Sequence, residues 1–106
     1  MFIPFSSLDN EEKRGITLSN ELYKTQIYKS IFGRKIRNKR NIRNVSIQQL
    51  AEDSGVSVNH INNIELGKSH PSAGLFHAIC NALHIDATTF FKEVMEEVEL
   101  LILEEE

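Results

Sequence analysis

Residues 47–66 constrain the fold of this chain more than any other segment, because their pattern predicts two short helices that cross at a tight turn. Ser46 and Ser57 each stand where a serine can cap a helix N-terminus. Gly55 lies between the two helices, where the turn requires a positive φ. The positions at the crossing are small or apolar: Leu50, Ala51, Val56, Ile61 and Ile64. Two helices held at such an angle leave the second one protruding from the domain.

The second of these predicted helices is rich in side-chain amides. Ile61 and Ile64 face inward when the helix advances by about 100° per residue. The other side is polar, with Asn59 and Asn63 one turn apart and His60 and Asn62 beside them. Asparagine is a mediocre helix former, so three within five residues call for an explanation. An amide can form paired hydrogen bonds to adenine in the DNA major groove, whereas the alternative is a solvated polar face.

Basic and acidic residues are segregated along the chain. The net charge is −3, yet residues 31–43 contain six basic side chains and no acid, and residues 93–106 contain seven glutamates and no base. The basic side chains are Arg34, Lys35, Arg37, Lys39, Arg40 and Arg43. Phosphates respond to the field of one face rather than to the net charge. The cluster is therefore interpreted either as a phosphate-binding surface or as a solvated basic helix.

The remaining segments show helical rather than strand patterns, with Ser19 as the cap of the first helix. The predicted helices are residues 19–30, 31–40, 47–54, 58–66, 73–83 and 87–92. We therefore expect an all-α fold in three parts. Residues 1–30 form an N-terminal extension with one helix, residues 31–92 form the main domain, and residues 93–106 form an acidic amphipathic tail.

Three stretches of the chain match a known family: FGRKIRNKR, SIQQLAEDSGVSVNHINNIELGKSHPS and LFHAICNALHIDATTFF. With these stretches, residues 32–92 resemble the Cro-type, or phage-repressor-like, helix-turn-helix regulators of the XRE family. The resemblance implies a five-helix DNA-binding domain. The helical pattern adds an extra N-terminal helix, and the tail is expected to form a C-terminal dimerisation segment. The resemblance also implies a dimer that binds double-stranded DNA at operators with two-fold symmetry.

The resemblance and the basic cluster together assign roles to individual residues. The family's base-reading positions map to Val58, Asn59, His60, Asn62 and Asn63. Candidates for phosphate contacts are Arg34, Lys35, Arg37, Lys39, Arg43, Ser46, Gln48, Ser57 and Lys68, where the two serines mark helix N-termini. Arg40 and Glu65 correspond to a structural ion pair that holds the recognition helix in place.

Two positions depart from the family pattern. Many members have a phosphate-binding glutamine where this chain has Ile47, so Gln48 or Gln49 is expected to replace that contact. Ser54 stands where a larger apolar side chain is common, which predicts looser packing at that point.

Apolar residues at helical spacing continue into the tail: Val94, Met95, Val98, Leu101 and Ile102. Glutamates fill most of the other face. We expect an amphipathic helix whose apolar stripe pairs with the same stripe of a second copy. One alternative is a strand at residues 98–103 that pairs across a dimer. The other is a helix that packs back on residues 19–30 of its own chain.

Other classes of protein find little support in the sequence. No apolar run approaches the roughly eighteen residues of a membrane span, and no secretory signal is recognisable. Cys80 is the single cysteine, which fits a reducing cytoplasm and a small core residue. The histidines lack metal-ligand spacing, and no catalytic constellation is visible. We therefore expect a cytoplasmic protein without metal, cofactor or enzymatic activity.

The function expected from the sequence is transcriptional regulation by a homodimeric repressor on a palindromic operator. Its half-sites are expected about 34 Å apart, which is one helical turn of DNA. The alternative is an antitoxin or anti-repressor, in which the apolar tail binds a protein partner and the DNA-binding domain serves as a tether.

Overall fold

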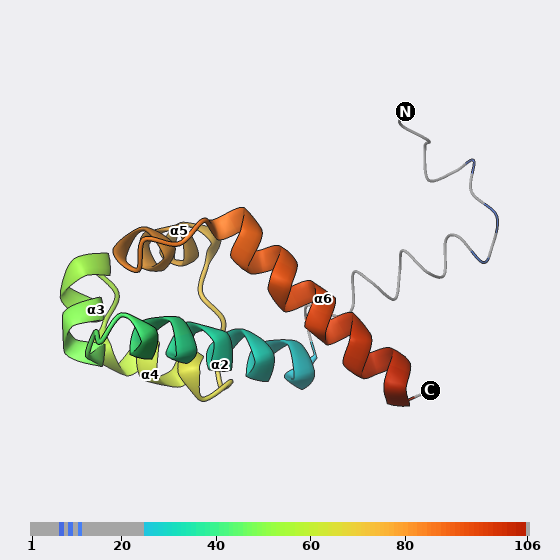
Figure 1. Ribbon diagram of the computed structural model, residues 1–106, viewed down its shortest axis with the longest axis horizontal. Helices are drawn as coiled ribbons and strands as arrows, with labels where there is room; N and C mark the ends of the chain where they lie inside the picture. Colours follow the sequence, from blue (N-terminus) through green and yellow to red (C-terminus); the bar gives the residue numbers. More distant parts are fainter. Residues whose placement is uncertain (1–6, 8, 10, 12–24, 106) are drawn as a thin grey trace.

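The computed structural model describes Ser7, Asp9, Glu11 and residues 25–105, with side chains as far as Leu101. Its helices are α2 (Gln26–Ile42), α3 (Ile47–Ser54), α4 (Val58–Glu65), α5 (Ala73–Ala82) and α6 (Ala87–Glu105). The described residues contain no strand, so the all-α prediction is confirmed. Figure 1 shows α3 and α4 together at one end and α6 running from α5 past the start of α2.

Each of these helices begins at a side chain that caps its first turn. Ser46 Oγ accepts a hydrogen bond from the backbone N–H of Gln49 at 3.0 Å, and Ser57 Oγ accepts one from His60 at 3.1 Å. Equivalent caps are formed by Thr25, Ser72 and Asp86. Because the first N–H groups of a helix lack partners within it, these caps fix where each helix starts.

Residues with left-handed backbone conformation lie at or just after the ends of α2, α3 and α4. Gly55 ends α3 with a φ of 74°, and Gly67 follows α4 with the same φ. Asn44 has a φ of 56° in the turn between α2 and α3. Glycine and asparagine tolerate this conformation better than other residues, so the turn predicted at Gly55 is confirmed.

The boundary predicted between helices at residues 19–30 and 31–40 is wrong. A single helix, α2, runs from Gln26 to Ile42, and residues 19–24 lie outside the described residues. Tyr28, Ile31 and Phe32 are all buried on one face of α2. Burial of a continuous apolar face on both sides of Ser30 favours one uninterrupted helix.

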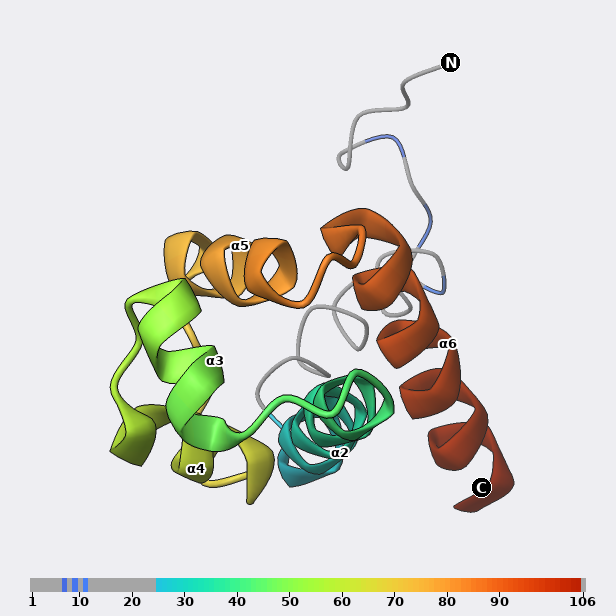
Figure 2. The ribbon, with the colours of Figure 1, turned by 60° about the vertical axis from the view of Figure 1, so that its left-hand side comes forward.

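A cluster of rings joins α2 to α5 and α6. The ring of Phe32 lies 5.3 Å from that of Phe76 and 5.4 Å from that of Phe90, centroid to centroid. His70, between α4 and α5, packs on Phe32 at 4.7 Å and shares a hydrogen bond of 3.1 Å with the hydroxyl of Tyr28. In this arrangement α2 packs against α4 on one side and α6 on another, as Figure 2 shows.

The tail continues α6 as a helix, as expected, so the strand alternative is wrong. Val94 and Val98 are fully buried, because α6 packs along α2 of the same chain. These two valines therefore pack within the protomer, contrary to the expectation that they face a second copy. Met95 is half-buried and Leu101 is 39% exposed, while the side chain of Ile102 lies outside the described residues.

Candidate nucleic-acid interface

Hydrogen bonds of Ser54 fix the turn between α3 and α4. Its hydroxyl donates to the carbonyl of Leu50 at 2.6 Å, and its oxygen lies 3.2 Å from the backbone N–H of Val56, which donates to it. Leu50 and Val56 are buried in one core with Ile61 and Ile64. A serine at this position thus ties the end of α3 to the turn, in place of the apolar contact common in the family. The crossing angle of α3 and α4 is set by this turn and core.

α2 holds α4 through a close approach and an ion pair. A Cβ added to Gly33 of α2 would lie 2.1 Å from the carbonyl oxygen of Ile64. Arg40 donates to both carboxylate oxygens of Glu65, from Nε at 2.8 Å and Nη2 at 2.9 Å, and from Nη1 to the carbonyl of Val45 at 2.9 Å. The Arg40 and Glu65 side chains are only 11% and 5% exposed, and their hydrogen bond raises the pKa of the Arg40 guanidinium.

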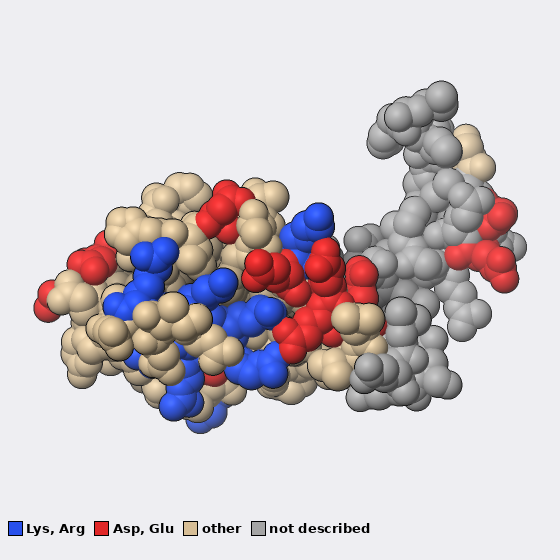
Figure 3. All heavy atoms as spheres, viewed as in Figure 1, with Lys and Arg blue, Asp and Glu red and all other residues tan. Residues whose placement is uncertain are grey.

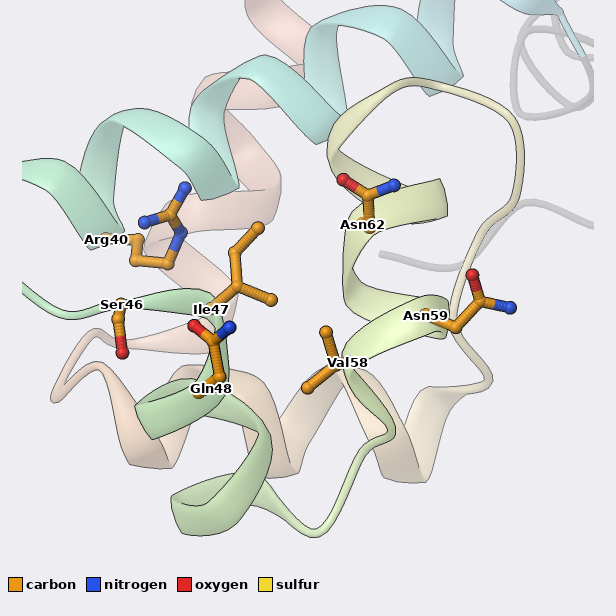
Figure 4. A pocket seen from close by; sticks show the side chains of 7 residues that line it. All are labelled: Arg40, Ser46, Ile47, Gln48, Val58, Asn59 and Asn62. Carbon is orange, nitrogen blue, oxygen red and sulfur yellow. The ribbon is translucent and has the colours of Figure 1, made fainter.

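An open groove of about 580 Å³ separates the first turns of α3 and α4, as Figure 4 shows. It is lined by Arg40, Ser46, Ile47, Gln48, Val58, Asn59 and Asn62. Asn59 and Asn62 are exposed, and Val58 is 41% exposed. Among the described residues, neither asparagine has a side-chain hydrogen bond to its own chain. The amides are therefore available to an external ligand.

The groove gathers three of the five expected base-reading residues. Val58, Asn59 and Asn62 share one face of α4, whereas His60 and Asn63 are half-buried and do not line the groove. Helical geometry alone had favoured Asn59 and Asn63 as the outward pair. The position of α3 determines which side of α4 is open. The spacing of residues within α4 alone does not reveal this tertiary contact.

α3 contributes Ile47 and Gln48 to the groove. Gln49 instead donates a hydrogen bond of 2.8 Å to Asp53, so Gln48 is the one of the two glutamines that faces the groove. Ile47 is half-buried against the core and forms an apolar part of the lining. From the sequence, Ile47 stood out only as the residue in place of a family glutamine. Its position directly after the Ser46 cap is the signal that could have placed it here.

Glutamates of α6 pair with three of the expected phosphate-binding cations. Arg34 and Lys35 both pair with Glu97, Lys35 at 3.2 Å, and Lys39 lies 3.9 Å from Glu93. Burial opposes ionisation of Glu97, but hydrogen bonds from Arg34 and Lys35 outweigh it and lower the pKa of this carboxyl. Figure 3 shows the Lys and Arg side chains gathered over α2 with acidic side chains of α6 beside them.

The remaining cations have different surroundings. Arg43 donates a hydrogen bond of 3.1 Å to the carbonyl of His84. Arg37 and Lys68 are exposed and form no ion pair with any described residue. Arg37 lies one turn after Gly33, on the side of α2 that approaches α4. Arg37 therefore leaves an uncompensated positive charge on the side of α2 that approaches α4.

The rest of the described chain offers few other reactive groups. Cys80 is buried, and desolvation, followed by the charge of Asp86, raises the pKa of its thiol to about 11. No three metal-ligating side chains gather within the described residues. None of the described helices combines the length and apolarity needed to cross a bilayer.

Two short crossing helices, the second with a free amide-bearing face and braced by a third helix, define a helix-turn-helix domain. The chain belongs to the helix-turn-helix family of the XRE type, which matches residues 36–90, about half of its length.

Similar curated proteins include transcriptional regulators from two organisms. An uncharacterised HTH-type transcriptional regulator of Mycobacterium tuberculosis is 39% identical over 59 residues, which cover 56% of this chain and 42% of that protein. Another, from Sinorhizobium fredii, is 28% identical over 93 residues, 88% of this chain and 59% of the relative. The chain therefore spans about two fifths to three fifths of the length of these curated relatives.

Solved structures show the same arrangement of helices. A crystal structure of the clp gene regulator ClgR from Corynebacterium glutamicum is similar with a TM-score of 0.66 and 26% identity, covering 74% of this chain and 83% of that one. A second crystal structure of ClgR gives a TM-score of 0.60 at 26% identity, with 66% and 91% covered.

Proposed function

We propose that this protein is a transcriptional repressor that binds double-stranded DNA sequence-specifically. The observation that carries the proposal is the open groove in which Gln48, Asn59 and Asn62 have side-chain amides free for external partners. A major groove about 12 Å wide admits a helix such as α4, and amides pair with the edges of its bases. The names of the relatives, as transcriptional regulators and a clp gene regulator, support the same class here.

Phosphate contacts surround the groove in this proposal. The N-termini of α3 and α4, at Ser46 and Ser57, present backbone N–H groups to anions, and Gln48 adds a side-chain donor. Arg37 and Lys68 supply positive charge that no described acidic side chain neutralises. Four cations contribute less because they are engaged within the chain: Arg34, Lys35, Lys39 and Arg43.

The repressor acts as a homodimer on an operator with two-fold symmetry, in the cytoplasm and without catalytic activity. The end of α6 provides the contact, because Leu100 is 60% and Leu101 is 39% exposed beyond the buried Val98. The same end on a second copy covers these side chains. Two recognition helices in successive major grooves then require half-sites about 34 Å apart.

Selection of bound sequences from a random DNA pool tests this proposal. We expect a symmetric consensus that is bound at least ~10³-fold more tightly than random duplex. Asn59→Ala should weaken binding of the consensus and leave random duplex unchanged. The matched variant Asn81→Ala, at an exposed position of α5, should change neither. Equal affinity for selected and random duplexes at several salt concentrations refutes sequence-specific binding, and an asymmetric single half-site refutes the dimer.

The exposure of Leu100 also favours a second candidate, in which the end of α6 binds a heterologous protein as in an antitoxin or anti-repressor. Sedimentation of the full chain separates the two. A dimer that Leu101→Glu dissociates supports the homodimeric repressor. A monomer at concentrations where DNA is bound supports the second candidate.

A further inference from the structure

Most of the side chains that line the groove are either apolar or amides. Ile47 and Val58 are its apolar side chains, and Gln48, Asn59 and Asn62 are its amides. Figure 4 shows the apolar pair lying between Gln48 on one side and the two asparagines on the other.

The one charged side chain in the lining is Arg40, and it is already engaged. Three of its nitrogens donate to Glu65 and to the Val45 carbonyl, and the side chain is only 11% exposed. Freeing it would leave the carboxylate of Glu65, which is 5% exposed, without its partner. The groove therefore presents no free guanidinium or ammonium group to a base.

The edges of guanine, adenine and thymine bind best to different kinds of side chain. Guanine presents two acceptors, N7 and O6, and is bound best by the paired donors of arginine or by lysine. Adenine presents an acceptor and a donor, N7 and N6, which match the two ends of a side-chain amide. Thymine adds a C5-methyl group, which prefers apolar surroundings. Amides beside a small apolar patch thus fit adenine and thymine and suit guanine poorly.

We propose that this groove selects A·T base pairs, with a thymine methyl group held between Ile47 and Val58 and adenine bound by Asn59 or Asn62. This inference rests on the proposed function and specifies the half-site. The methyl group contacts Val58, which is 41% exposed, and Ile47, which is half-buried and held by the core. Because Ile47 is anchored in the core, the apolar contact is rigid and selects on shape as well as polarity.

Replacing thymine by uracil in the selected half-site tests the inference directly. The substitution removes the C5-methyl group and keeps Watson–Crick pairing, so only the apolar contact is lost. One buried methyl group corresponds to about a fourfold change in affinity. We expect the wild type to bind about fourfold more weakly when one particular thymine of one half-site is replaced, and to bind unchanged when thymines outside the groove are replaced.

Val58→Ala and Asn81→Ala make the comparison specific. Val58 is the exposed first residue of α4, so its truncation should leave the melting temperature nearly unchanged, which thermal unfolding checks. Val58→Ala should show a smaller difference between thymine and uracil duplexes, because only Ile47 still contacts the methyl group. Asn81→Ala, on α5 and outside the lining of the groove, should keep the fourfold difference.

The outcomes distinguish this inference from the function on which it rests. A strong consensus with G·C pairs at the positions that respond to Asn59→Ala overturns the inference and leaves the repressor standing. So does a wild type that tolerates uracil at every thymine, or a Val58→Ala variant that keeps the full difference. A pool that yields no consensus overturns the proposed function, and the inference falls with it.

Discussion

Arg40 and Glu65 form a buried ion pair between α2, which supports the recognition helix, and α4, which is that helix. Two hydrogen bonds join the side chains, and a third ties Arg40 to the carbonyl of Val45 in the approach to α3. Removing one partner leaves a buried charge uncompensated, which is far more costly than replacing both by apolar side chains.

Arg40→Leu should therefore lower the free energy of unfolding by about 3 kcal/mol, because it leaves Glu65 buried and unpaired. The double variant Arg40→Leu/Glu65→Leu should recover at least half of this loss, since no unpaired charge remains. Urea denaturation at pH 7 measures both. Arg37→Leu, three residues away at an exposed position, should change stability by less than ~0.5 kcal/mol. Equal losses in the single and double variants would contradict the argument.

His70 makes stability depend on pH near neutrality. Desolvation, followed by the charge of Lys29, lowers the pKa of its imidazole in the folded chain. The unfolded chain, with an ordinary histidine pKa of about 6.5, therefore takes up the proton first as the pH falls. His70 thus favours the folded state above that pKa and disfavours it below.

Thermal unfolding of the wild type and of His70→Phe at pH 7.5 and pH 5 checks this. Phe keeps a ring against Phe32 and does not titrate. Between pH 7.5 and pH 5, the melting temperature of the wild type should fall further than that of the variant. The low pKa of the Glu97 carboxyl acts at more acidic pH and leaves this window unaffected. A parallel decline of both proteins would show that His70 does not carry the effect.

Among the helices, local sequence signals were sufficient to predict the bounds where capping and turn residues mark the ends. The bounds of α3 and the start of α4 follow from Ser46, Gly55 and Ser57, whose capping and turn roles depend on neighbours in sequence. The length of α2 was mispredicted, because its continuity depends on burial against α6, which is distant in sequence. The same limit applies to the open side of α4, which α3 determines.

The spacing of α2 and α4 depends on Gly33. Any Cβ at this position meets the carbonyl oxygens of Ile64 and Glu65, at 2.1 and 2.8 Å, and these are backbone atoms that cannot rotate away. Gly33→Ala should therefore lower the free energy of unfolding by about 2 kcal/mol through overpacking and weaken binding to the selected DNA.

Gly74→Ala is the matched control for this substitution. A Cβ there has no neighbour within 4 Å, and Gly74 lies in the first turn of α5. Alanine should be neutral or stabilise the chain by up to ~1 kcal/mol, since it is the better helix former. Chemical denaturation of both variants gives the comparison, and a Gly33→Ala chain as stable as the wild type would show that the helices can separate without cost.

For the whole molecule, the net charge of −3 conceals two different sides of α2. Toward α6, the cations Arg34, Lys35 and Lys39 are matched by Glu93 and Glu97. Toward α4, Arg37 has no such partner among the described residues. The side of α2 with the ion pairs attaches α6 to the domain, and the side with Arg37 is left to attract phosphate. The sequence revealed the two charged segments, whereas their pairing required the fold.

Arg37→Ala and Lys35→Ala remove the same charge from these two sides. Arg37→Ala should weaken binding to all DNA sequences alike and reduce the slope of log affinity against log salt by about 0.9, the value for one phosphate contact. Lys35→Ala should leave the slope nearly unchanged. Affinities for random duplex over a series of salt concentrations provide the test, and equal slopes for the two variants would refute the division of charge.

The burial of Cys80 has a practical consequence for studying this protein in solution. Its thiol is 1% exposed and, with a pKa of about 11, is almost entirely protonated at neutral pH, so alkylating reagents should reach it only in the unfolded chain. Reaction in urea but not in buffer would verify this. A cysteine introduced at Asn81 could then carry a fluorophore as the sole label, with the native sequence otherwise intact.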